Sequence, residues 1–92
     1  MIKSFKHKGL ELFYNTGNKK GIIPEHCNKI ARILDRLDAS VNPQDMNLPG
    51  YSLHKLSGKE INYWAVSVNG NWRIIFQFIG EDVILVDYLD YH

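Results

Sequence analysis

Cysteine is almost absent from this chain of 92 residues, since Cys27 is the single one. One cysteine excludes an internal disulfide framework and a zinc site built from several cysteines, so we expect a protein that folds in the reducing cytoplasm. Because cysteine is among the residue types most often buried, we expect Cys27 to be a small apolar residue of the core. Long hydrophobic runs are also missing: the most apolar stretch, 74–79, is far shorter than the roughly 20 residues of a membrane helix. Residues 1–8 lack the apolar segment of a signal peptide. We therefore expect neither a membrane span nor export.

Motifs for metals and cofactors are missing as well. The four histidines are scattered, and no pair has the short spacing of a preformed ligand set: His7, His26, His54 and His92. The chain has no glycine-rich phosphate loop and no Gly-x-Ser-x-Gly nucleophile motif. We therefore expect no metal site and no cofactor.

Apolar and aromatic residues are plentiful, at 45% and 12% of the chain, and at this length they predict one compact domain over residues 1–92. The net charge of +1 conceals an asymmetry. Residues 1–59 carry ten Lys and Arg against five Asp and Glu, whereas residues 60–92 carry one against five. The basic half is suited to contact a polyanion, although ordinary solvated surface is the alternative interpretation.

Two helices are predicted in the N-terminal half. From His7 onward, spaced apolar residues indicate a short helix that stops at Gly17. A second helix has Pro24 in its first turn and ends near Ala39, because Asn42-Pro43 disfavours helical geometry. Its apolar residues recur at spacings of three and four and form one stripe: Cys27, Ile30, Ile33, Leu34 and Leu37.

Four strands are predicted after the helices, over residues 51–56, 63–68, 71–79 and 83–87. Asn69-Gly70 favours a hairpin between the second and third strands, because this dipeptide suits a type I′ turn with positive φ at both central residues. Helices that precede an antiparallel sheet predict an α+β fold, with two helices packed on one face of about four strands.

The hairpin also predicts which residues share a face of the sheet. A two-residue loop at 69 and 70 sets Val66 opposite Arg73 and Trp64 opposite Ile75. Arg73 is then expected beside Trp64, Val66 and Gln77 on the face away from the helices. The helix-covered face is expected to hold Tyr63, Ala65, Trp72, Ile74, Phe76 and Phe78. An uncovered sheet face that carries an arginine near lysine-rich loops suits a phosphate backbone.

Several side chains on or beside these strands are capable of acid-base and anion-binding chemistry: His54, Lys55, Lys59, Arg73, Asp90, Tyr91 and His92. RNA cleavage without a metal needs a base for the ribose 2′-OH, a cation for the phosphate and an acid for the leaving 5′-oxygen. His54, Arg73 and His92 could fill these roles. The alternative for each is structural: a hydrogen-bonded strand histidine, an exposed cross-strand arginine and a frayed chain end.

Three segments in order resemble the HigB toxins of the RelE/ParE superfamily. They are Tyr-x-Leu-His-x-Leu-x-Gly at 51–58, Tyr-Trp-x-Val-x-Val-Asn-x-x-Trp-Arg-Ile-x-Phe-Gln-Phe at 63–78, and the ending Asp-Tyr-His at 90–92. The opening Met-Ile-Lys-Ser-Phe and the chain length also match. The resemblance implies a RelE-type fold and a ribosome-dependent messenger-RNA endonuclease toxin of the cytoplasm. It also implies a partner, the helix-turn-helix antitoxin HigA, which binds the monomeric toxin in a hetero-oligomer and holds it inactive.

The resemblance assigns site residues position by position. The active-site histidine of the family matches His54, its strand arginine matches Arg73, and its terminal tripeptide matches Asp90, Tyr91 and His92. We hypothesise that His54 or His92 is the general base and that Arg73 stabilises the phosphorane. Tyr91 would stack on a base or orient the phosphate, and Asp90 would hold a histidine tautomer.

Lysines are the expected contacts to RNA. Ser57 stands where some relatives have a lysine, so either the nearby Lys59 substitutes for it or the charge is dispensable; Lys55 lies on the other side. A further basic group is expected to contact ribosomal RNA, with solvated surface as its alternative: Lys3, Lys6, Lys8, Lys19 and Lys20. Acidic positions late in the chain suit the antitoxin.

Two other functions stay open at this point. A ParE-like inhibitor of DNA gyrase would share the fold and need no nuclease residues, and a non-catalytic interaction domain would use the tail residues only structurally. His54 and the Asp-Tyr-His ending favour the endonuclease.

Overall fold

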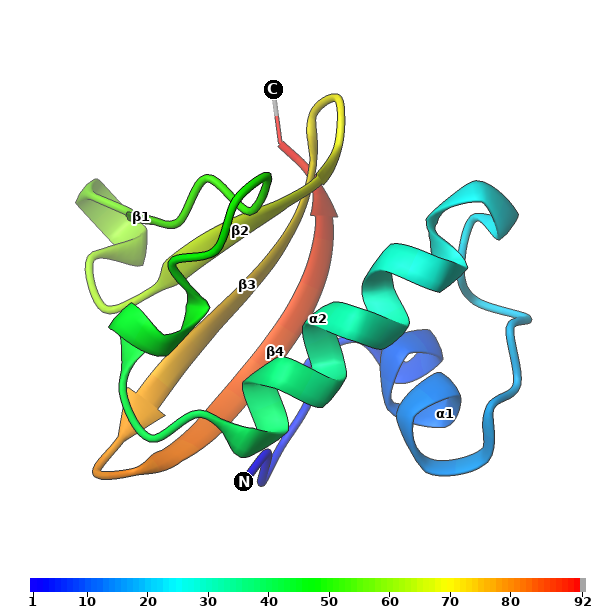
Figure 1. Ribbon diagram of the computed structural model, residues 1–92, viewed down its shortest axis with the longest axis horizontal. Helices are drawn as coiled ribbons and strands as arrows, with labels where there is room; N and C mark the ends of the chain where they lie inside the picture. Colours follow the sequence, from blue (N-terminus) through cyan, green and yellow to red (C-terminus); the bar gives the residue numbers. More distant parts are fainter. Residues whose placement is uncertain (92) are drawn as a thin grey trace.

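A computed structural model describes residues 1–91, and within them two α-helices precede a four-stranded antiparallel sheet (Figure 1). α1 spans Lys8–Thr16 and α2 spans Cys27–Ala39. The strands lie in the sheet in chain order: β1 (His54–Lys55), β2 (Trp64–Asn69), β3 (Trp72–Ile79) and β4 (Asp82–Asp90). Three short 3₁₀ turns occupy the connections: Pro24–His26, Pro43–Met46 and Gly58–Glu60. The predicted α+β class is confirmed.

Both helices begin and end where local sequence signals predicted. The Nδ1 atom of His7 accepts a hydrogen bond from the Leu10 N–H at 3.0 Å and caps α1. Gly17 ends that helix with a left-handed φ of 78°, which a residue without Cβ adopts without strain. The turn begun by Pro24 leads directly into α2, which stops at Ser40, shortly before Asn42-Pro43.

The main core lies between the helices and one face of the sheet. Both helices lie on the same side of the strands in Figure 1. The predicted stripe of α2 is buried there, together with Leu10 of α1. The sheet contributes the buried side chains Val66, Val68, Ile74, Phe76, Val83, Val86 and Tyr88. This packing holds β2, β3 and β4 as one platform, with the other face turned away from the helices.

The N-terminal segment extends the sheet in a way that the sequence did not predict. Ile2 and Phe5 form parallel bridges to Val83 and Val86 along the outer edge of β4. Between these bridges Leu85 adopts a left-handed φ of 56°, and its N–H donates to the Ser4 hydroxyl at 2.9 Å. The irregularity bends β4, and the N-terminal segment covers backbone groups that an edge strand would otherwise expose.

The predicted register of the central hairpin was wrong by one residue. Asn69 stays in β2 and pairs with Trp72, so the turn is Gly70-Asn71. Positive φ was predicted at both Asn69 and Gly70, but of these two residues only Gly70 has it, at 56°. A bulge at Val68 then sets Ser67 opposite Arg73. The faces of β2 are consequently exchanged. Its helix-facing residues are Trp64, Val66 and Val68, and Tyr63 and Ala65 lie on the other face with Ile75. The predicted faces of Arg73, Ile74 and Phe76 on β3 hold.

The strand predicted at 51–56 is reduced to two residues, because the chain turns at Ser52 with a left-handed φ of 49°. After β1 the connection returns over the face away from the helices. Leu56 is buried there against Ala65 and Ile75, and Tyr63 and Leu89 pack around them. This face is therefore not fully open: a second, smaller apolar cluster covers its centre and leaves the hairpin end accessible. No helix among residues 1–91 is long and apolar enough to span a membrane.

Candidate functional site

Arg73 is fixed at the hairpin end of the sheet, on the face away from the helices. Its Nη1 atom donates to the carbonyl oxygens of Gly70 at 2.6 Å and of Trp72 at 3.0 Å, and it lies 3.5 Å from the Ser67 hydroxyl. All three contacts use the same nitrogen of the guanidinium. The half-buried cation is thus held by the turn, which presents a planar donor group of the kind that binds phosphate with two parallel hydrogen bonds.

His54 is exposed on β1 and pairs with Ala65, which places it on the same face as Arg73. Its Nδ1 lies 2.9 Å from the carbonyl oxygen of Ser52. A carbonyl oxygen only accepts, so Nδ1 carries the proton and the neutral ring has its lone pair on Nε2. The Ser52 carbonyl, which lies in a left-handed turn, therefore favours the tautomer in which Nε2 can accept a proton.

Tyr91 follows β4 and is tied to two other segments. Its N–H donates to the Asn71 carbonyl at 2.7 Å, and its hydroxyl donates to the Glu60 carboxylate at 3.3 Å. The negative charge of Glu60 raises the pKa of the Tyr91 phenol above its ordinary value. A phenol is already protonated at neutral pH, and the shift extends its role as a hydrogen-bond donor to higher pH, at the same end of the sheet as Arg73.

The other two tail residues are placed differently. Asp90 pairs with Trp72 at the end of β4, whereas Leu89 pairs with Arg73, so alternation puts the Asp90 side chain on the opposite face from Arg73. His92 lies outside the described residues. Among the predicted catalytic residues, the structure therefore brings Arg73, His54 and Tyr91 to one face.

The predicted lysines divide between two regions. Lys6 belongs to the N-terminal segment, and its Nζ lies 5.9 Å from the ring centre of Tyr63, on the face that carries Arg73. Lys59 is exposed in the 3₁₀ turn over the same face. Lys55 is exposed on β1. Lys3 is exposed in the N-terminal segment, where its N–H donates to the Val83 carbonyl. The other three predicted lysines are exposed on α1 or the connection after it, in the helical layer: Lys8, Lys19 and Lys20.

Sequence reasoning missed three residues that shape this site. Ser67 and Gly70 hold Arg73, and Glu60 holds Tyr91. Ser67 was missed because the predicted register set Val66 opposite Arg73. Glu60 contacts a residue 31 positions later, and a contact over that distance leaves no local pattern. An oriented imidazole, an anchored cation and a phenol donor on one face can together bind a phosphodiester and remove the proton of a neighbouring hydroxyl group.

Comparison with known proteins identifies what the chain resembles. Residues 3–92 match the family described as "RelE-like toxin of type II toxin-antitoxin system HigB". The chain is 41% identical over 92 residues to the Endoribonuclease HigB of Proteus vulgaris, and the match covers 100% of both chains. It is 35% identical over 94 residues to the Toxin HigB-1 of Vibrio cholerae serotype O1, a match that covers 100% of this chain and 98% of that relative.

Proposed function

The chain belongs to the HigB-like family of RelE-type toxins of type II toxin-antitoxin systems, and from this membership we propose that it cleaves messenger RNA on the ribosome. The Proteus vulgaris relative, which matches this chain over its whole length, is named as an endoribonuclease. The single observation that carries the proposal is the shared face of His54 and Arg73, each held by backbone carbonyl oxygens: His54 by that of Ser52, and Arg73 by those of Gly70 and Trp72.

The proposed reaction needs no group beyond side chains of this chain. Nε2 of His54 takes the proton of the ribose 2′-OH, and the 2′-oxygen forms a bond to phosphorus. The guanidinium of Arg73 stabilises the added negative charge of the phosphorane. The bond to the 5′-oxygen then breaks, and His92 returns a proton to that oxygen. The products are a 2′,3′-cyclic phosphate and a 5′-hydroxyl.

Two further side chains are assigned supporting roles in this reaction. Tyr91 donates from its phenol to the phosphate or stacks on a base, as its position at the same end of the sheet as Arg73 supports. Asp90 is proposed to hold the tautomer of His92, which lies two residues later in the sequence.

A type II toxin has a cognate antitoxin. We propose that this antitoxin is a helix-turn-helix protein of the HigA type, that it joins the monomeric toxin in a hetero-oligomer, and that the complex resides in the cytoplasm with the ribosome. Lys6, Lys55 and Lys59 are proposed to contact the bound messenger RNA. The lysines of the helical layer are proposed to contact ribosomal RNA: Lys8, Lys19 and Lys20.

Cleavage of ribosome-bound messenger by purified protein tests the proposal. We expect His54→Ala, Arg73→Ala and His92→Ala each to reduce the cleavage rate by about 10²-fold or more, because each removes a proton carrier or the charge on the phosphorane. Gln44→Ala changes an exposed amide in the Pro43–Met46 turn and serves as the matched control. Near-parental rates for both Arg73→Ala and His92→Ala would remove the assignment, and gyrase inhibition without RNA cleavage would replace it.

A further inference from the structure

A notch interrupts the sheet beside the C-terminal end of β3. β2 begins at Trp64, which pairs with Phe76, so in the described register residues 77–79 pair with β4 on one side and have no β2 partner on the other. A cavity of about 320 Å³ occupies this notch. It is lined by Lys55, Asn62, Trp64, Gln77 and Phe78, together with two isoleucines. Its volume is at the lower end of the range for small-molecule sites.

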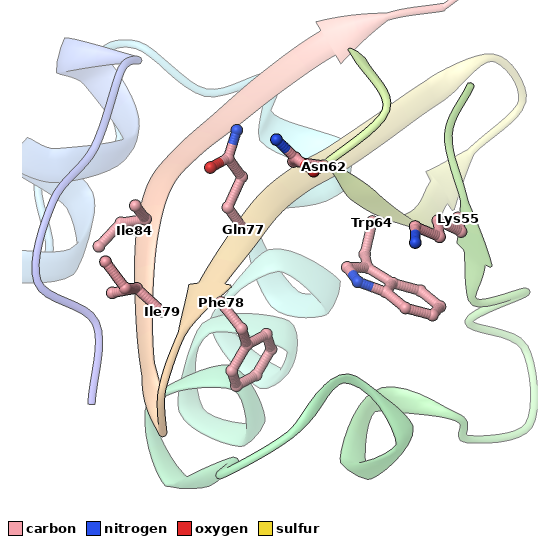
Figure 2. Close-up of a pocket in the computed structure, with 7 residues that line it drawn as sticks. All are labelled: Lys55, Asn62, Trp64, Gln77, Phe78, Ile79 and Ile84. Carbon is pink, nitrogen blue, oxygen red and sulfur yellow. The ribbon is translucent and has the colours of Figure 1, made fainter. Parts of the chain in front are cut away.

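Two amides, two aromatic rings and one ammonium group line the cavity. In Figure 2 the amide ends of Asn62 and Gln77 lie near one another, and the rings of Trp64 and Phe78 extend in the other direction. The Nζ atom of Lys55 lies 5.9 Å from the ring centre of Trp64. None of the seven described residues that line the cavity has a carboxylate. The cavity therefore offers a π-face, amide donors and acceptors, and a positive charge.

We propose that this cavity binds one nucleotide of the messenger strand, at a position separate from the cleaved phosphodiester; this inference rests on the proposed function. An indole ring stacks on any base. The amides of Asn62 and Gln77 each supply a donor and an acceptor for the edge of that base. Lys55 supplies the cation for the adjoining phosphate. Each chemical part of a nucleotide thus has a matching group in the lining.

The cavity lies on two of the strands that carry the candidate active site. Lys55 directly follows His54 on β1 and pairs with Trp64, so its side chain lies on the face opposite to that of His54. Gln77 lies four residues after Arg73 on β3, so both point to the same face, about 13 Å apart at the usual rise of ~3.3 Å per residue. One RNA strand that is cleaved at Arg73 can therefore follow β3 to the notch. A peptide added as a strand beside residues 77–79 is the competing occupant, but it would bind through backbone groups and would not depend on the amides or on Lys55.

Direct binding is measured with the four ribonucleoside 5′-monophosphates, by NMR of the side-chain amide signals of Asn62 and Gln77 and the indole N–H of Trp64. We expect at least one nucleotide to shift these three signals together and saturably. Asn62→Ala should weaken that binding by about 2–10-fold, and Lys55→Gln by about 2–5-fold. Gln44→Ala should bind like the parent. Absence of a saturable shift at these signals with all four nucleotides would overturn the inference.

Cleavage kinetics separate this inference from the proposed function. Asn62→Ala and Gln77→Ala should raise the KM for ribosome-bound messenger by about 2–10-fold and leave kcat within about twofold, because the contacts are remote from the reacting atoms. Asn15→Ala, an exposed amide in α1, is the second matched control. If the parent cleaves and both cavity variants match it, the nucleotide site is wrong and the endonuclease assignment stands. If the parent does not cleave, the endonuclease assignment fails, and the nucleotide titration decides the cavity on its own.

Discussion

Nδ1 of His26 and the hydroxyl of Tyr88 lie 2.6 Å apart in the core, although 62 residues separate them in the sequence. Both side chains are 4% exposed, and the Trp72 ring lies 4.7 Å from that of Tyr88 between ring centres. Trp72 precedes Arg73, and Tyr88 lies three residues before Tyr91. The buried pair thus connects the start of α2 to the two strand ends that carry the candidate site.

Removal of the Tyr88 hydroxyl should destabilise the protein. Tyr88→Phe keeps the ring packing but takes a hydrogen-bond partner from a buried imidazole, so we expect a loss of about 1–3 kcal/mol in the free energy of unfolding. Urea denaturation measures it. Tyr91→Phe, which removes an exposed hydroxyl, should change stability by less than about 0.5 kcal/mol. Equal effects of the two substitutions would contradict a special role for the buried pair.

The shape of the Arg73 guanidinium should matter as well as its charge. Arg73→Lys keeps the charge, but a single ammonium cannot bond to the carbonyls of Gly70 and Trp72 and also face a phosphate with two parallel donors. We expect cleavage at least about 10²-fold slower than the parent, with unchanged folding by circular dichroism. Arg32→Lys on the exposed side of α2 is the control. Retention of most activity by Arg73→Lys would show that charge alone suffices.

The Glu60 carboxylate should control the ionisation of Tyr91. Its charge disfavours the phenolate and raises the pKa of Tyr91, so Glu60→Gln should lower that pKa toward the ordinary value of about 10. NMR titration of the Tyr91 ring carbons measures the change. Glu81→Gln alters an exposed carboxylate in the β3–β4 turn and should leave the titration unaffected. An unchanged Tyr91 pKa in Glu60→Gln would mean that the two groups do not meet in solution.

Asp38 should make stability depend on pH. Its Oδ1 accepts hydrogen bonds from the Ile2 N–H and the Tyr14 hydroxyl, each at 2.9 Å, and the bond from Ile2 is the main cause that lowers the Asp38 pKa. A folded-state pKa below the unfolded value stabilises the protein above about pH 4, and that contribution is lost as pH falls through the folded pKa.

Asp38→Asn should therefore cost about 1–2 kcal/mol at pH 7, and its difference from the parent should shrink below about pH 4. Denaturation at a series of pH values measures this. Asp35→Asn, on the exposed side of the same helix, is the control. A difference that stays constant down to pH 2 would refute the role of the Asp38 charge.

Local signals in the sequence determined the secondary structure and its order. Four features that depend on neighbours within a few residues were predicted: the start of α1 near His7, its end at Gly17, the proline before α2 and the apolar stripe of α2. The side-chain cap that His7 provides to α1 was not predicted. The chemical types of the site residues were also readable, since His54, Arg73 and Tyr91 lie in motifs of the chain itself. The short length of β1, only two residues, could not be predicted, because the left-handed turn at Ser52 has no strong sequence signal.

Only the tertiary structure decided how the site is assembled. A bulge at Val68 shifts the pairing by one residue, and because side chains alternate between faces, this small shift exchanges both faces of β2 and brings Ser67 to Arg73. The contact of Glu60 with Tyr91, the pairing of the N-terminal segment with β4 and the notch beside β3 likewise join residues far apart in the chain. Such contacts depend on the packing of the whole domain. Caps, turns and periodicity depend only on residues close together in the chain, and a sequence pattern can therefore predict them.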